Sequence, residues 1–85
     1  MRYEVQITKK ALKQLRAIPK PFNANIFAAI RKLENTETWG DVKRLTDHEY
    51  KYRLRVGNYR VLFDTEDDVR ILEVQEVKKR DERTY

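Results

Sequence analysis

Positively charged residues in the C-terminal half of the chain have a spacing that could bind a row of phosphate groups. The segment 50–56 alternates in character, so one face of a strand would carry its three cations, Lys51, Arg53 and Arg55. Successive cations would lie roughly 6.6 Å apart, at about 3.3 Å per residue, which is close to the phosphate spacing along one nucleic-acid strand. A solvated sheet face would have the same pattern, so the spacing suggests an anionic partner without being specific for one.

Arg60 would join these cations through a tight turn. If Gly57 and Asn58 form a two-residue hairpin loop, Arg55 and Arg60 become direct partners on neighbouring strands. Like charges directly opposite each other destabilise a sheet. We therefore expect the two arginines either to splay into solvent or to be held in place for an anion.

A further group of cations follows the last expected strand. Terminal runs of charge are usually solvated tails. Here, however, the preceding strand would return beside the hairpin, so these cations and Tyr85 could meet Arg60 in one groove. The cations of this tail are Lys78, Lys79, Arg80 and Arg83.

The sequence offers little for metal or thiol chemistry. It has no cysteine and one histidine, so it lacks a thiolate nucleophile, a disulfide framework and the ligands of a transition-metal cage. The acids from Asp64 to Asp68 fit a turn, and His48 fits a solvated or capping position. We therefore expect neither a metal nor a cofactor.

The net charge of +5 favours an acidic partner, which could be nucleic acid, an anionic membrane surface or an acidic protein. A membrane surface is the weakest of the three, because much of the basic excess lies in strand-like sequence and not on an amphipathic helix. No run of about 18 apolar residues occurs, and the N-terminus lacks the apolar core of a signal peptide. We expect a cytoplasmic protein without a membrane partner.

One strand and two helices precede the cationic segment. Residues 2–7 alternate as a strand does, and Thr8 can cap a helix of about three turns over 9–18. Pro19 and Pro21 end that helix, because proline cannot donate a backbone hydrogen bond and disfavours helical geometry before it. Apolar residues then recur at helical spacing over 22–35, which predicts a second helix packed against the first.

Three strands follow a loop over residues 36–49 that Trp39 is expected to anchor. The pattern predicts these strands at 50–56, 59–64 and 69–77. The order of elements indicates a single α+β domain over residues 1–85, with a four-stranded antiparallel sheet and a two-helix hairpin packed on one face. At this length the core must be thin.

The combination of these features resembles the RelE/ParE toxin superfamily over nearly the whole chain. Its most specific part is R-L-R-V-G-N-Y-R-V at residues 53–61, followed after an apolar strand by Lys79-Arg80 and a late tyrosine. The superfamily contains ribosome-dependent messenger-RNA endonucleases that a co-produced antitoxin blocks. It also contains gyrase poisons that share the fold without the nuclease residues.

By this resemblance, five catalytic positions of the nuclease branch are occupied: Lys51 and Arg53 in one strand, Arg60 in the next, Arg80 after the last strand, and Tyr85. Arg53 stands where a lysine is common, and a guanidinium clamps phosphate well but carries protons poorly. Tyr85 is the final residue, whereas related chains often continue. Its position is therefore expected to be loosely held.

The implied function is that of a type II toxin cutting messenger RNA in the ribosomal A site without metal. The ribose 2′-hydroxyl would attack the scissile phosphate, with Lys51 as base because neighbouring cations favour its neutral form. Arg60 and Arg80 would clamp this phosphate, with Arg53 holding it or a neighbour, while Tyr85 would stack on a base or approach the leaving oxygen. The remaining cations would contact messenger or ribosomal RNA: Arg55, Lys78, Lys79 and Arg83.

Two other functions fit the same sequence. One is a toxin that binds and poisons DNA gyrase without cutting RNA. The other is a module that only sequesters its antitoxin. Under each of these three hypotheses, the expected protein partner is a cognate antitoxin with a segment that wraps the basic surface.

Overall fold

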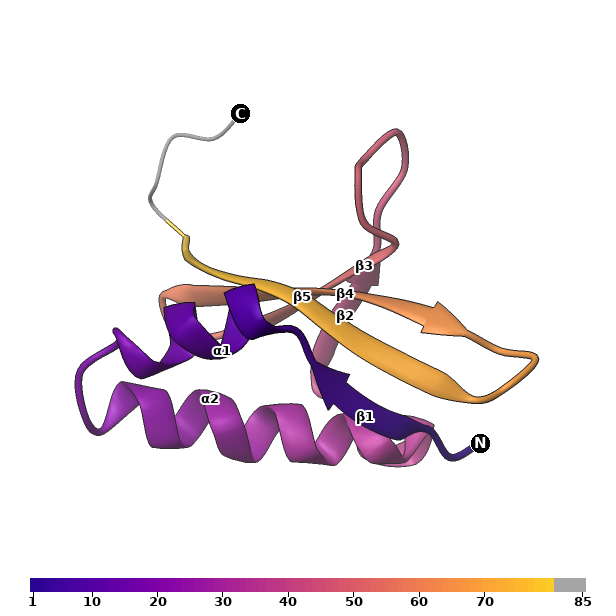
Figure 1. Cartoon of the computed structure of the whole chain (residues 1–85), viewed down its shortest axis with the longest axis horizontal. Coiled ribbons are helices and arrows are strands. Elements are labelled where there is room, and N and C mark those ends of the chain that lie inside the picture. Colours follow the sequence, from indigo (N-terminus) through magenta and orange to yellow (C-terminus); the bar gives the residue numbers. More distant parts are fainter. Residues whose placement is uncertain (81–85) are drawn as a thin grey trace.

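The computed structural model describes residues 1–80, which form one mixed sheet of five strands with two helices below it (Figure 1). The strand order is β1-β5-β4-β3-β2. The elements in chain order are β1 (Glu4–Ile7), α1 (Lys9–Arg16), α2 (Phe22–Arg31), the 3-10 turns η1 (Lys32–Glu34) and η2 (Thr36–Thr38), β2 (Asp41–Arg44), β3 (Tyr52–Val56), β4 (Tyr59–Glu66) and β5 (Ile71–Lys79).

The two helices form as their sequence signals indicate. The Thr8 hydroxyl accepts a hydrogen bond from the Ala11 amide at 3.1 Å and caps α1, as expected. The helix ends at Arg16, two residues earlier than we predicted, ahead of the prolines. The second helix is also shorter than predicted, because after Arg31 the chain tightens into the turns η1 and η2.

The predicted sheet is right in its central part and wrong at both edges. Strands β3, β4 and β5 form the expected antiparallel meander. The segment Asp41–Arg44, predicted as loop, is a fifth strand that pairs antiparallel with β3. The first strand, predicted to be antiparallel, runs parallel to β5, with Glu4 opposite Ile71. An alternating pattern fixes which face a side chain takes but not the direction of the neighbouring strand.

Strand boundaries also differ from the prediction. Tyr50 and Lys51 precede β3 and do not belong to it. Strand β4 continues to Glu66, so the turn comes later than predicted. Lys78 and Lys79, which we assigned to the tail, are the last two residues of β5.

The core lies between the helices and the lower face of the sheet. Its largest fully buried side chains come from α2, η1 and strands β3 to β5: Ile26, Ile30, Leu33, Leu54, Val61, Phe63, Leu72 and Val74. Burying each such side chain stabilises the fold by about 1.5–3 kcal/mol relative to exposure. This layer fixes the backbone of the three central strands, and therefore the side chains on their other face.

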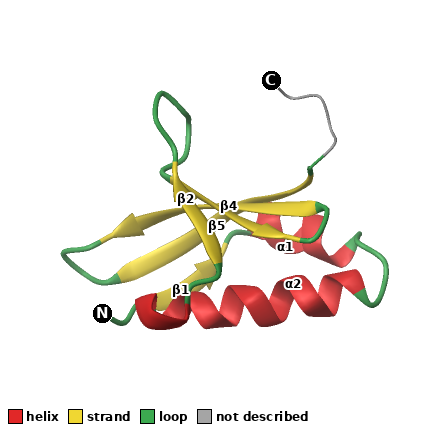
Figure 2. Ribbon diagram, turned by 180° about the vertical axis from the view of Figure 1, so that it is seen from behind, coloured by secondary structure: helices red, strands yellow, loops and turns green. Residues whose placement is uncertain are grey.

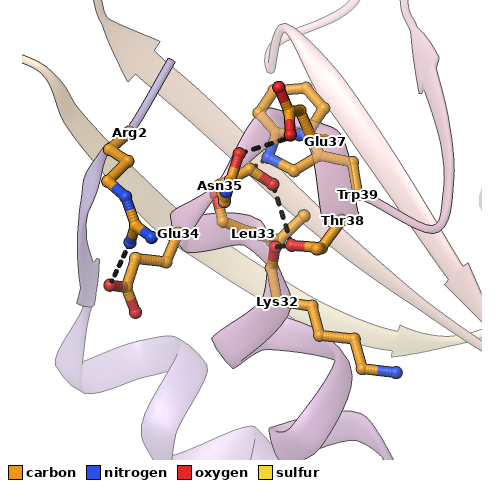
Figure 3. A network of polar contacts seen from close by, with 8 residues as sticks. All are labelled: Arg2, Lys32, Leu33, Glu34, Asn35, Glu37, Thr38 and Trp39. Carbon is orange, nitrogen blue, oxygen red and sulfur yellow. Dashed lines mark hydrogen bonds and ion pairs between the residues drawn. The ribbon is translucent and has the colours of Figure 1, made fainter.

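Trp39 anchors the crossing from α2 to the sheet, as predicted. Its indole Nε1 donates to the Leu33 carbonyl at 2.8 Å, and the Thr38 hydroxyl donates to the Lys32 carbonyl at 2.7 Å (Figure 3). The indole ring also meets the Phe63 ring edge-on, with centroids 5.5 Å apart. Both carbonyls at the end of the helical segment thus have donors, and β2 starts from a fixed point.

No helix within residues 1–80 is long and apolar enough to cross a membrane.

Candidate functional site

The upper face of the sheet, which we call the open face, is not covered by the helices. In Figures 1 and 2 the helices lie below the sheet, and the loop of residues 45–51 between β2 and β3 rises from the other side. In β3, Leu54 packs into the core, so its neighbours Arg53 and Arg55 project from the open face. The alternation of the sequence predicted this arrangement correctly.

Three cations cross the open face in a straight row, which we call the cationic row. Arg55 lies directly opposite Arg60 on β4, as predicted, and Arg60 lies directly opposite Lys78 on β5. The Cβ atoms of such direct partners are typically about 4.5–5.5 Å apart. A single phosphate group can therefore contact cations from more than one strand.

The hairpin turn holds Arg80 beside this row. The Arg80 amide donates to the Asn58 carbonyl, and the Arg80 guanidinium donates to the Gly57 carbonyl at 3.5 Å. Gly57 has a φ of 57°, in the left-handed region that glycine adopts without strain. Arg60 in turn donates to the Arg80 carbonyl at 3.0 Å. The contacts link the two arginines that the resemblance assigns to the phosphate clamp.

Glu76 lies one row further along the open face and was not identified from the sequence. It stands opposite Leu62, which in turn stands opposite Arg53. Its side chain is 8% exposed, and its Oε1 atom lies 3.5 Å from the Nζ atoms of both Lys10 and Lys78.

The surroundings of Glu76 keep it charged. Burial alone would raise the pKa of this carboxyl, but the hydrogen bond from Tyr50, followed by the charges of Lys78 and Lys10, lowers its pKa below the ordinary value. Burial, together with the hydrogen bond to Glu76, raises the pKa of the Tyr50 hydroxyl well above its ordinary value. The pair is thus a neutral phenol donating to a carboxylate.

Lys51 lies away from the cationic row. Its Nζ atom donates to the Thr65 carbonyl at 2.8 Å, and its amide donates to the Asp64 carboxylate at 2.8 Å. We expected cations around Lys51, but carboxylates line the hollow beside it. We call this region the acidic end of the open face, and its carboxylates are Glu49, Asp64, Glu66 and Glu73.

Arg53 joins β3 to the edge strand. Its Nη1 atom contacts Asp41 twice, at 3.2 Å from the carbonyl oxygen and 3.3 Å from the carboxylate Oδ1. Its side chain is only 12% exposed. Arg53 therefore flanks the cationic row with one side of its guanidinium already engaged.

The other candidate residues divide into three groups. Lys79 lies opposite Tyr59 and lines an apolar hollow with Pro19 and Phe22, on the helix side of the sheet and away from the cationic row. Arg83 and Tyr85 lie outside the described residues. His48 accepts a hydrogen bond from the Tyr50 amide at 3.1 Å, which is a capping contact of the expected kind.

This arrangement can bind and polarise an anion. Guanidinium groups donate paired hydrogen bonds to phosphate, and a lysine ammonium adds a point charge. Among residues 1–80, no cluster of histidine, cysteine or carboxylate side chains has the arrangement of a metal site. The cations of this face can stabilise negative charge on a bound anion.

Residues 5–84 match the family model described as the ParE toxin of type II toxin-antitoxin systems. The chain is a member of this toxin family. The toxin is also 31% identical over 85 residues to a protein of Methanocaldococcus jannaschii that carries the toxin name RelE1, covering 95% of this chain and 93% of that one. The predicted membership of the RelE/ParE superfamily is confirmed.

Solved structures of RelE proteins have the same fold as this toxin. RelE in the archaeal RelE–RelB complex of Pyrococcus horikoshii is 26% identical, with a TM-score of 0.79 over 96% of this chain and 99% of that one. RelE in the RelBE2 complex of Mycobacterium tuberculosis is 24% identical, with a TM-score of 0.78 over 94% of this chain and 100% of that one. A variant of E. coli RelE in the free state is 16% identical, with a TM-score of 0.77 over 98% of this chain and 88% of that one.

Proposed function

We propose that this toxin cleaves RNA, that Arg60 and Arg80 bind the scissile phosphate, and that the rest of the cationic row contacts the RNA beside it. The observation that carries this proposal is the register of β3, β4 and β5. It sets Arg55, Arg60 and Lys78 side by side on a face that the helices do not cover, with Arg80 beside the row at the hairpin turn. Because the backbone fixes this row, its donors are preorganised for a charge that develops on phosphate oxygens.

The reaction is attack of the ribose 2′-hydroxyl on the adjacent phosphorus, which releases the 5′-oxygen of the next nucleotide. Negative charge accumulates on the non-bridging oxygens as the new bond forms, and Arg60 and Arg80 stabilise it by paired hydrogen bonds. Arg53 holds this phosphate or the next one. Removal of the 2′ proton and protonation of the leaving oxygen are the remaining steps, and Lys51 and Tyr85 are the residues that the resemblance offers for them.

The base role of Lys51 requires its Nζ atom to leave the Thr65 carbonyl, to which it donates. A structural role, in which Lys51 fixes the loop of residues 45–51 to β4, accounts for both of its hydrogen bonds. We therefore assign the phosphate to the cationic row and test Lys51 separately.

The substrate in this proposal is messenger RNA in the ribosomal A site, as the resemblance implies. Arg55 and Lys78 contact the RNA backbone beside the scissile phosphate, and Arg83 is assigned to messenger or ribosomal RNA. Lys79 faces the helix side of the sheet, so it serves a separate contact.

A cognate antitoxin is the proposed protein partner. The P. horikoshii relative, at 26% identity, was solved as a complex with RelB. The apolar hollow beside Lys79, lined also by Val56 and Tyr59, combines apolar and basic groups, as a protein interface requires.

Mapping the 5′ ends of cellular RNA after brief induction of the toxin tests this function. We expect new ends at codon-spaced positions within messenger RNA. The Arg60→Ala variant should not produce them, whereas Arg31→Ala, which removes an exposed cation of α2, should produce them normally. Unchanged RNA ends in cells that stop growing would overturn the proposal.

Gyrase poisoning is the second candidate, because the family model that matches is the one named for ParE. It predicts DNA breaks after induction and intact messenger RNA. Growth arrest with neither effect, or no arrest, would instead indicate a module that only sequesters its antitoxin.

A further inference from the structure

We propose that Glu76 is a positioning residue of the RNA-cleaving site, holding Lys78 beside Arg60 and carrying the cationic surface from β5 onto α1 through Lys10. This role rests on the proposed function. It concerns a carboxylate that the cleavage chemistry described above does not use.

Glu76 collects donors from three separate parts of the chain. Lys10 belongs to α1, Lys78 to β5, and Tyr50 to the loop of residues 45–51. Both ammonium groups lie 3.5 Å from the same oxygen, Oε1. One buried side chain thus joins α1, β5 and the loop of residues 45–51.

A buried carboxylate is an unfavourable neighbour for a site that binds phosphate. It costs desolvation free energy, and its negative charge weakens the attraction of the open face for RNA. Glu76 therefore reduces affinity unless its contacts contribute something that an apolar residue could not. What these contacts contribute is the fixed location of two cations at the surface.

The exposed fractions show how this arrangement works. Glu76 is 8% exposed, whereas Lys78 is 29% and Lys10 is 61% exposed. The carboxylate lies beneath the ammonium groups, which remain accessible to a ligand. Lys78 is also the direct partner of Arg60, so without Glu76 repulsion from that guanidinium would push its ammonium group away from the row.

Glu76 is thus expected to weaken RNA binding through its charge and to favour cleavage through its hold on Lys78. Because these two effects have opposite signs, the role can be tested. Replacing Glu76 with Gln removes a negative charge, so RNA should bind as tightly as before or more tightly. The same change releases Lys78, so the phosphate should be held less accurately during cleavage. A residue that matters only for folding would not separate binding from turnover in this way.

The experiment is cleavage of a messenger RNA on programmed ribosomes by the purified toxin, with kcat and KM measured separately. For Glu76→Gln we expect kcat to fall by about tenfold or more while KM stays the same or falls, since a misplacement of about 1 Å can lower a rate by about 100-fold. The matched control is Glu73→Gln, the same change on the same strand at the acidic end, with kcat unchanged. An unchanged kcat in Glu76→Gln, or a raised KM alone, would overturn the role.

Lys78→Met keeps the test decisive if Glu76→Gln does not fold. This variant leaves Tyr50 and Lys10 in place and should reproduce the kcat loss, and the double variant should lose no more than either single one. Full kcat in Lys78→Met would overturn the role, whatever Glu76→Gln does.

If the wild-type toxin cuts no RNA, the proposed function fails and this role with it. If the wild-type toxin cuts and the variants cut equally well, only the role of Glu76 fails.

Discussion

The cationic row and the acidic end of the open face are built on the same strands, yet different charges surround their cations. In and beside the row, Arg60 and Arg80 donate to the backbone carbonyls of Arg80 and Gly57, and Lys78 shares the Glu76 carboxylate with Lys10. At the acidic end, the Lys51 ammonium also donates to a carbonyl, that of Thr65, but four carboxylates line the hollow around it. A carbonyl satisfies a hydrogen bond without neutralising the charge of its donor, whereas nearby carboxylates offset that charge. The comparison teaches that the balance of charge around a cation, more than its place in a sequence motif, decides whether it can attract phosphate.

The largest expected effect comes from the two arginines of the proposed phosphate clamp, Arg60 in the row and Arg80 beside it. Arg60→Ala and Arg80→Ala should each lower RNA cleavage by about 100-fold or more and abolish growth toxicity, as expected when a donor to a developing oxyanion is removed. Circular dichroism and thermal melting should show that both variants remain folded. If either variant keeps full toxicity, the row is not the phosphate site and the comparison fails.

The Lys51→Met variant tests the acidic end of the open face. If Lys51 fixes the loop of residues 45–51 and is not the base, cleavage should fall only a few-fold, since surface hydrogen bonds contribute about 1 kcal/mol each. The shape of the pH–rate profile should match that of the wild-type toxin. A profile that loses one limb in Lys51→Met would restore the base role and place the reaction nearer the acidic end.

Adjacent lysines on opposite faces give a finer test of the row. Lys78→Ala should weaken binding to a short RNA several-fold and reduce the dependence of log K on log salt by about one unit, as for the loss of one phosphate contact. Lys79→Ala also removes one positive charge, but on the helix side of the sheet, so the slope of log K against log salt should stay at the wild-type value. Equal slopes for the two variants would mean that net charge alone, and not the open face, sets RNA affinity.

The smallest expected effect is on stability in acid, at the boundary between the two regions. The pKa of Glu76 is lower in the folded chain than its ordinary value of 4.5, so its ionised form stabilises the fold above that pH. This contribution should disappear as the pH falls below about 4.5, toward the folded-state pKa. Urea unfolding of wild type and Glu76→Gln should therefore give free energies that differ near neutral pH and converge in acid. A constant difference over this whole range would contradict the assigned pKa shift.

The part of the site that local rules govern could be predicted from the sequence. Alternation placed Arg53 and Arg55 on the open face, and a two-residue turn at Gly57 set Arg55 opposite Arg60. Both inferences depend only on residues a few positions apart. The family followed from the same segment, because few folds combine that hairpin with the late cations.

The rest depends on contacts between distant residues. Lys51 leaves the strand pattern because the Asp64 side chain accepts its amide, which no local pattern specifies. Glu76 was missed because the register shifts at Leu62/Phe63, so the alternation of β5 is interrupted and Glu76 turns to the open face. The spacing of Val74 and Val77, three residues apart with two polar residues between them, is the one signal that could have indicated this bulge.

The parallel pairing of β1 with β5 has a consequence for when the sheet can form during synthesis of the chain. Because β5 lies between β1 and β4, the sheet stays incomplete until residues 71–79 have left the ribosome. The N-terminal strand and helix must wait for a partner almost 70 positions away, since Glu4 pairs with Ile71. Pairings over such distances form late and slowly. The strand that completes the sheet also carries Lys78 and leads to Arg80, so the proposed phosphate site forms only when the sheet closes.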